Sequence, residues 1–116
     1  MNVVEAYKNV ERYLYEYPTI KKVLECNHNI GKERLEKTKQ AIDLLEWALT
    51  ELKHDPFYEI IPKYYFEGMT HETIACDMEV NNTTISRNRH RLVDKMVVML
   101  FPDVIMQGII DKRKGI

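Results

Sequence analysis

Glycine and proline are scarce in this chain, with four of each among 116 residues. Both interrupt helices, so their scarcity leaves room for long unbroken helical segments. No stretch approaches the ~18 consecutive apolar residues of a membrane-spanning helix. The first residues also lack the basic start and apolar run of a signal peptide. We therefore expect a cytoplasmic protein without membrane contact, forming one compact domain or a small domain with a helical extension.

Motifs that carry chemistry are scarce as well. The two cysteines, Cys26 and Cys76, are far apart and form no CxxC pair, so we expect reduced, partly buried thiols and no metal site. The glycines are isolated, which excludes a phosphate-binding loop. Ser86 and His90 have the spacing of a nucleophile and its base, but no oxyanion-stabilising loop accompanies them. The sequence predicts neither an enzyme nor a cofactor.

Charge is nearly balanced overall, with a net charge of −1. This argues against a protein that coats nucleic acid without specificity. The basic residues are concentrated in one short segment, where Arg87, Arg89, Arg91 and Lys95 stand against a single acidic residue, Asp94. Any electrostatic binding role is therefore expected there.

The beginning of the chain has helical periodicity. Apolar residues over 2–17 recur at alternating four- and three-residue steps, which predicts an amphipathic helix. Pro18 is expected to end this helix, because the residue before a proline is pushed out of helical geometry. A shorter helix is expected over 20–26 and a loop over 27–31.

Residues 32–53 give the longest helical signal. Their apolar residues follow a seven-residue repeat over nearly three heptads, and Leu44, Trp47 and Ala48 widen the apolar face. We expect this helix to pack on the first helix or on a second copy of the chain.

The stretch HDPFYEIIPKYYFEGMT predicts a helix with a break. Asp55 is a predicted N-cap, followed by Pro56 at the first helical position. Pro62 is expected to kink the helix or split it in two, and Gly68 to end it. The predicted core contacts of this segment are Phe57, Ile60, Ile61, Tyr64 and Tyr65.

Residues 69–92, MTHETIACDMEVNNTTISRNRHRL, carry the clearest functional pattern. Thr70 can cap a short helix, and Asn81 can cap a second one after a turn over 79–81. The first helix offers the small Ala75 where the second crosses close to it. These features are typical of a helix-turn-helix. The predicted inward-facing residues are Ile74, Met78, Val80, Ile85, Leu92, Val93 and Met96.

The opposite face of the second helix is polar, with hydroxyl and amide side chains first and arginines one turn later. A recognition helix uses this arrangement, because its first turns enter the major groove while amide and guanidinium groups contact bases and phosphates. Arg87 and Arg91 are predicted to contact bases or flanking phosphates. The full predicted DNA-binding set is Thr70, Asn81, Asn82, Thr83, Thr84, Ser86, Arg87, Asn88, His90 and Arg91.

A competing interpretation is that SRNRHR is a solvated helix face, as charged runs usually are. The preceding helix, the turn and Ala75 favour DNA binding instead. Two positions depart from the usual pattern: Glu79 stands where glycine is common, and Asn88 where a second core residue is common. We therefore expect a strained backbone or a modified turn at Glu79.

The stretch IIPKYYFEGMTHETIACDMEVNNTTISRNRHRLVDKM resembles the C-terminal half of small phage regulators of the ArpU/RinA type. Their helix-turn-helix is similar to the fourth region of bacterial sigma factors, which reads the upstream promoter element. The N-terminal helix ending in YEYPTIK, with the long charged helix after it, also resembles that family. The resemblance implies a phage or prophage activator of late genes in a Gram-positive bacterium, with DNA contacts carried by Asn81 to Arg91.

The tail, FPDVIMQGIIDKRKGI, predicts a last helix started by Pro102 and Asp103. Its apolar residues predict either a lid on the core or a dimer contact.

Together these patterns predict an all-α protein. Residues 1–54 form an N-terminal helical part for oligomerisation or partner binding, and residues 55–116 a helix-turn-helix part. The predicted function is sequence-specific binding of double-stranded DNA to regulate transcription. Two alternatives stay open: a phage small terminase subunit, and a sigma-like factor that binds RNA polymerase. The predicted partners are therefore double-stranded DNA, RNA polymerase and a second copy in a homodimer.

Overall fold

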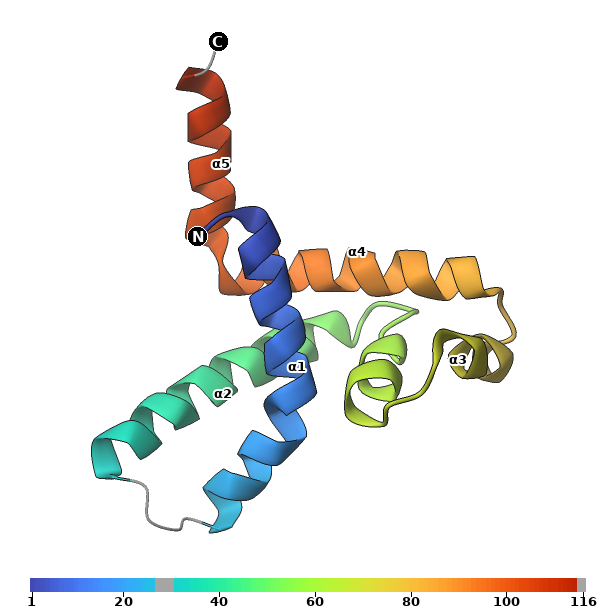
Figure 1. The fold of residues 1–116 in the computed structure, drawn as a ribbon, viewed down its shortest axis with the longest axis horizontal. Coiled ribbons are helices and arrows are strands. Elements are labelled where there is room, and N and C mark those ends of the chain that lie inside the picture. The colour runs from blue at the N-terminus through green and yellow to red at the C-terminus, as the bar shows by residue number, and fades with distance from the viewer. Residues whose placement is uncertain (27–30, 115–116) are drawn as a thin grey trace.

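The structure is a computed structural model that describes residues 1–26 and 31–114. Within these ranges the chain is helical and contains no strand, which confirms the all-α prediction (Figure 1). All of the predicted loop over 27–31 except Gly31 lies outside the described residues. The elements are α1 (Val3–Cys26), α2 (Lys32–Leu52), the π-helical segment η1 (Pro62–Phe66), α3 (His71–Met78), α4 (Asn82–Leu100) and α5 (Pro102–Lys114).

Helix α1 runs without interruption through Pro18, so the prediction that Pro18 ends the first helix is wrong. A proline inside a helix removes one backbone hydrogen bond and costs about 3 kcal/mol. Tyr17, Ile20 and Leu24 lie on both sides of it and pack against the main core. Burial of their apolar surface offsets the cost of the proline.

Helix α2 confirms the long helix predicted over 32–53, and its seven-residue repeat faces inward from Ile42 to Leu52. Ala48 is buried as well. Leu44 and Trp47 remain 47% and 49% exposed, so the buried face is narrower than the sequence predicts.

The segment between α2 and α3 is a series of turns followed by one π-helical turn. Asp55 accepts a hydrogen bond from the backbone N–H of Phe57 at 2.9 Å, as a capping residue does. Pro62 begins η1, whose backbone closes with a bond from the N–H of Glu67 to the carbonyl oxygen of Pro62 at 3.0 Å. Gly68 has a φ of +69°, a conformation that glycine adopts without steric cost.

The helix predicted to start at Asp55 and Pro56 is instead a series of turns, and helical structure begins at Ile60 and continues through Pro62. The predicted break at Pro62 is therefore wrong, because the proline stands in the first helical turn, where its missing N–H costs nothing. The predicted end at Gly68 is confirmed.

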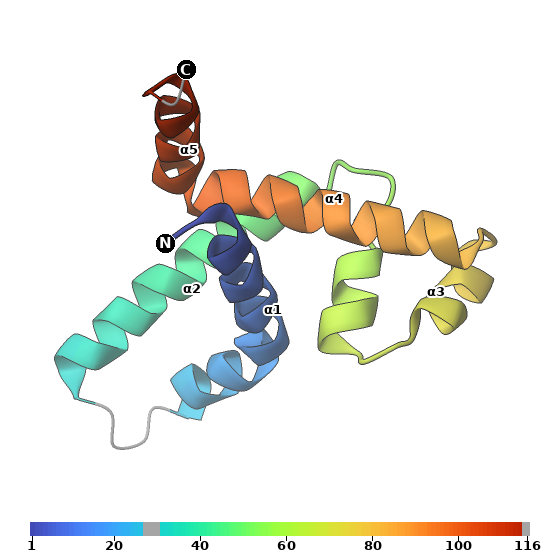
Figure 2. The same cartoon turned by 45° about the horizontal axis from the view of Figure 1, so that its top comes forward.

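Helices α1, α2 and α4 pack around one main core, with α4 crossing both of the others (Figures 1 and 2). Residues on both sides of position 54 contribute to it. The buried members are Ala6, Val10, Leu14, Ile42, Leu45, Ala48, Leu49, Leu52, Ile61, Tyr65, Leu92, Val93, Met96, Val97 and Val104. A second, smaller core lies beneath α3 and the first turns of α4 and contains Ile60, Ile74, Ala75 and Ile85.

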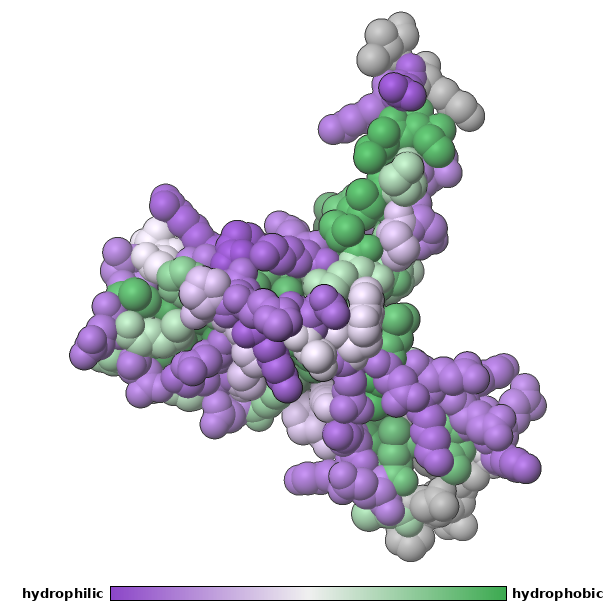
Figure 3. Space-filling view, turned by 180° about the vertical axis from the view of Figure 1, so that it is seen from behind, coloured by the Kyte–Doolittle hydropathy of each residue, from purple (hydrophilic) through white to green (hydrophobic). Residues whose placement is uncertain are grey.

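Helix α5 projects from the body of the molecule, beyond the C-terminal end of α4 (Figures 1 and 2). Val104, in its first turn, is buried and Ile105 packs against the main core. Beyond that turn the apolar side chains are exposed, as the space-filling view shows (Figure 3). The tail therefore covers the core with its first turn alone.

Within residues 1–26 and 31–114, every helix is too short or too polar to cross a bilayer. Both cysteines are unpaired and exposed, so the expected partial burial of Cys26 and Cys76 is wrong.

Candidate nucleic-acid interface

Two capped helix N-termini lie next to each other at one edge of the molecule. The Thr70 hydroxyl accepts a hydrogen bond from the backbone N–H of Thr73 at 3.2 Å, at the start of α3. The Asn81 side-chain oxygen accepts from the N–H of Thr84 at 2.8 Å and from its hydroxyl at 2.9 Å, at the start of α4. Both predicted caps are confirmed. Each N-terminus carries the positive end of its helix dipole.

The turn between the two helices has a left-handed residue at Glu79, with φ 57° and ψ 42°. The N–H of Val80 bonds the carbonyl oxygen of Ala75 at 3.0 Å, and the N–H of Glu79 bonds that of Cys76 at 3.3 Å. This pair of bonds is a Schellman motif, which usually carries glycine at the left-handed position. The strain predicted at Glu79 is therefore present.

The small core fixes α3 and α4 relative to each other. Ile74 and Ile85 are fully buried between them, and Ala75 is buried in the wall of this core. Met78 and Val80 pack at its margin. The polar face of α4 is thereby held on a rigid pair of helices.

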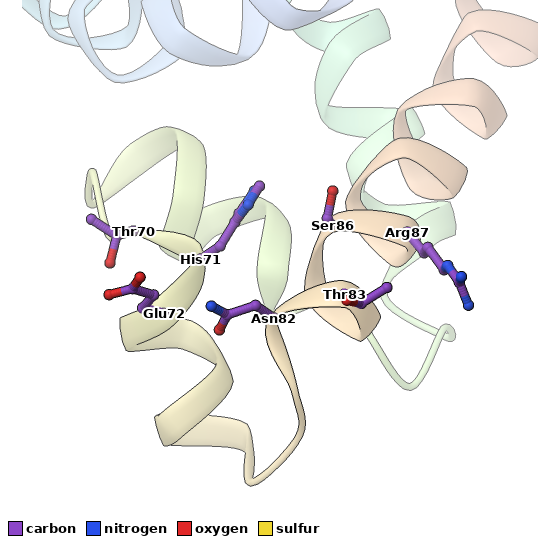
Figure 4. Close-up of a pocket in the computed structure, with 7 residues that line it drawn as sticks. All are labelled: Thr70, His71, Glu72, Asn82, Thr83, Ser86 and Arg87. Carbon is purple, nitrogen blue, oxygen red and sulfur yellow. The ribbon is translucent and has the colours of Figure 1, made fainter.

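An open hollow of about 750 Å³ lies between the start of α3 and the first two turns of α4. Figure 4 shows Asn82 pointing from α4 toward the start of α3, and Arg87 extending outward, away from α3. The lining residues are all of polar types and include one acid, Glu72, and one arginine. The lining residues are Thr70, His71, Glu72, Asn82, Thr83, Ser86 and Arg87.

Four of the predicted DNA-binding side chains have no partner among the described residues. Asn82, Thr83, Ser86 and Arg87 take part in no side-chain hydrogen bond or ion pair within this part of the chain. These residues form two adjacent pairs that are about one helical turn apart, so all four lie on one face of α4. The face therefore offers amide, hydroxyl and guanidinium groups to a ligand.

Arg91, also predicted to contact DNA, is engaged within the protein. Its guanidinium donates two hydrogen bonds to the Asp55 carboxylate, at 2.6 and 2.9 Å, and two more to the side-chain oxygen of Asn88. Lys95 adds an ion pair with the same carboxylate at 3.1 Å. The Asp55 side chain is 8% exposed, and the bonds from Arg91 hold its pKa well below the ordinary range.

His90 is in contact with α1. The Tyr7 hydroxyl is hydrogen-bonded to the Nδ1 atom of His90, and the two rings are stacked with centroids 5.8 Å apart. Burial, assisted by the negative charge of Glu11, raises the pKa of Tyr7 to about 12. The phenol therefore stays protonated and can donate its hydrogen to His90. Helix α1 thus reaches the margin of the polar face.

Arg89 lies on the opposite, buried side of α4. Its guanidinium donates to the Glu11 carboxylate and to the Tyr65 hydroxyl, each at 2.8 Å. It also lies 4.6 Å from the centre of the Tyr64 ring. The predicted DNA-binding set does not include Arg89. The sequence does indicate its burial, because Ile85, Arg89 and Leu92 follow helical spacing along the apolar face of α4.

His71 joins this buried network to the hollow. The Nε atom of Arg89 donates to the Nε2 atom of His71 at 3.1 Å. Burial, together with the positive charge of Arg89, lowers the pKa of His71. The neutral imidazole is therefore the acceptor in this bond. One wall of the hollow is thereby connected through Arg89 to Glu11 in α1.

Searches against protein-family models, curated proteins and solved structures found no match to the chain. A functional assignment therefore depends on the residues and geometry of the hollow and of α4.

Proposed function

We propose that α3, its turn and α4 form a helix-turn-helix unit that binds double-stranded DNA, with α4 as the recognition helix. The observation that carries this proposal is the set of four unpartnered polar side chains, Asn82, Thr83, Ser86 and Arg87, on one face of the first two turns of α4. Amide and guanidinium groups in that position can form paired hydrogen bonds with adenine and guanine in the major groove. The N-termini of α3 and α4 offer backbone N–H groups to flanking phosphates.

The distribution of charge supports site-specific rather than general binding. Arg89 is paired with Glu11, and Arg91 and Lys95 are paired with Asp55. In the basic segment this leaves Arg87 as the arginine without an internal partner among the described residues. Because phosphate attraction supplies most nonspecific affinity, a weakly basic face must gain its affinity from base contacts.

The biological role that we propose is transcription regulation, as a phage or prophage late-gene activator. It is supported by the resemblance of residues 60–96 to the ArpU/RinA-type regulators and by the capped helix pair within that stretch. Thr70, Asn81 and Thr84 act in this proposal by shaping the two helix starts. Asn88, His90 and Arg91 act as supports of α4, since each is engaged within the chain.

RNA polymerase is a second candidate partner, supported by a separate observation. Leu44 and Trp47 on α2 are about half exposed although they extend its apolar face. Tryptophan is enriched among the few residues that dominate the affinity of protein–protein contacts. Polymerase binding by the full chain without DNA, lost in the double variant Leu44→Ser/Trp47→Ser, would support this role. Binding unchanged by these substitutions would count against it.

The experiment that tests DNA binding is retention of sheared DNA from the source genome on the purified protein, at near-physiological salt. We expect one or a few enriched sites, upstream of a transcribed gene block. Arg87→Ala should lose this enrichment, whereas Arg34→Ala, which removes an exposed arginine from α2, should keep it. Enrichment beside packaging genes without a promoter would favour the small terminase alternative. No enrichment with the wild-type protein would contradict sequence-specific binding.

A further inference from the structure

Helix α5 has an apolar face that the described chain leaves uncovered. Met106, Ile109 and Ile110 are 56%, 50% and 42% exposed, whereas Val104, on the other side of the helix, is buried. Figure 3 shows apolar atoms running along this projecting helix. An exposed apolar stripe of this kind usually marks an interaction surface.

Two opposite charges flank this stripe. Asp103 lies one turn before Met106, and Arg113 lies one turn after Ile110. At 100° per residue these four positions fall within an arc of about 80° on the helix. Among the described residues, neither Asp103 nor Arg113 has an ion-pair partner. Along the helix, this face therefore presents an acidic residue, two apolar residues and a basic residue, in that order.

We propose that α5 docks in antiparallel orientation against α5 of a second copy of the chain. Antiparallel pairing places Asp103 opposite Arg113 of the partner subunit and Met106 opposite Ile110 of the partner subunit. A two-fold axis through the middle of the pair repeats each contact, as a closed dimer requires. Parallel pairing would instead place like charges side by side. Charge complementarity therefore favours a second copy of the chain as the partner and an antiparallel orientation of the two α5 helices.

The size of the face limits the area that the pair can bury. A helix of 13 residues is about 20 Å long, so the pair buries less than the ~800 Å² per partner of a typical stable interface. We therefore expect a reversible dimer with a Kd of about 1–100 µM. This inference does not depend on DNA binding.

The test is the molar mass of the full chain, measured by sedimentation equilibrium from low to high micromolar concentration. The mass should rise from 13.8 kDa toward twice that value. Ile110→Glu should raise the Kd by about tenfold or more. The matched control, Val23→Glu, places the same charge at an exposed valine of α1 and should leave the Kd unchanged. Helical circular dichroism checks that each variant is folded.

Reversal of the charges tests the orientation. Asp103→Arg and Arg113→Asp should each weaken the dimer, because each places like charges opposite each other. The double variant should restore the dimer, because an acidic and a basic residue then face each other again with their positions reversed. A wild-type chain that is monomeric at every concentration would overturn the proposal. So would a dimer that tolerates Ile110→Glu, or one that Val23→Glu disrupts equally. Failure of the double variant to restore the dimer would overturn the antiparallel pairing.

Discussion

Arg87 and Arg89 stand two residues apart on α4 and have opposite environments. Arg87 is exposed without a partner among the described residues, whereas Arg89 is buried between Glu11, Tyr65 and His71. The difference follows from helix geometry, since two residues correspond to a rotation of about 200°. The same residue type is thus available for binding at one position and structural at the other.

This contrast predicts separate effects on stability. Arg89→Met should lower the free energy of unfolding by about 3 kcal/mol, because it leaves the Glu11 carboxylate without its cationic partner in a partly buried position. Arg87→Met should change it by less than about 0.5 kcal/mol, as exposed substitutions usually do. Urea denaturation of both variants measures the difference. Equal effects would show that Arg89 is not a structural residue.

His71 predicts a dependence of stability on pH. Its pKa is lower in the folded chain than the ordinary value of 6.5, so the unfolded chain binds more protons between the two values. The free energy of unfolding should therefore fall as the pH is lowered from about 7 through the folded pKa. The depressed pKa of Asp55 acts in the same direction, but in a window below its ordinary 3.8.

The measurement is the free energy of unfolding at intervals between about pH 7.5 and 5, a range centred on histidine titration. His71→Gln keeps an acceptor for Arg89 without a titrating group, and its stability should vary less over this range. A variant with the same pH dependence as the wild type would show that His71 is not the group responsible.

At the level of the helices and turns, the turn between α3 and α4 contains backbone strain at Glu79, a non-glycine residue with a positive φ. Glu79→Gly should raise the free energy of unfolding by about 1 kcal/mol, because glycine adopts a φ of +57° without a Cβ clash. Glu79→Ala keeps the Cβ and serves as the control. Thermal unfolding of both variants tests this prediction, and a glycine variant no more stable than the alanine variant would contradict it.

Local patterns in the sequence predicted most of the helices. Thr70 and Asn81 were recognisable as caps because capping depends on residues three positions apart. The prediction at Pro18 is wrong because the cost of the proline is local, whereas the compensation comes from packing of Tyr17 and Ile20 on the core. Asp55 illustrates both cases: the sequence predicts it as a cap, and its side chain accepts a bond from the backbone N–H of Phe57, but its pairing with Arg91 joins residues 36 positions apart.

The candidate site was predicted in part for the same reason. Periodicity placed Asn82, Thr83, Ser86 and Arg87 on one face of a helix, and the structure places them together on the hollow. Periodicity cannot show which neighbours come from other helices. The contacts of Tyr7 with His90 and of Glu11 with Arg89 depend on how α1 crosses α4, and only the folded chain reveals them.

At the scale of the whole molecule, α4 connects the polar hollow to the main core. Its first turns face the hollow, and its last turns pack between α1 and α2. The molecule, with α5 included, measures 46 × 45 × 22 Å along its principal axes. Tyr7 and Glu11 of α1 contact His90 and Arg89, so α1 supports α4 beside the polar hollow.

Pairing of the basic residues with acids predicts a weak salt dependence of DNA binding. With Arg89, Arg91 and Lys95 engaged, few cations remain to displace counterions. The slope of log affinity against log salt should be about −1 to −3 per chain. Fluorescence anisotropy on an enriched duplex measures it. A slope steeper than about −6 would mean that internal ion pairs open to contact phosphates.

DNA binding by the first turns of α3 and α4 is tested directly by a titration of the ¹⁵N-labelled protein with duplex DNA, followed through the amide chemical shifts. Even weak, nonspecific binding at low salt is sufficient for this measurement. We predict that the largest shifts belong to residues 70–72 and 82–87, with α2 unaffected. Shifts confined to α2 or α5, or none at all, would contradict the assignment of this face to DNA.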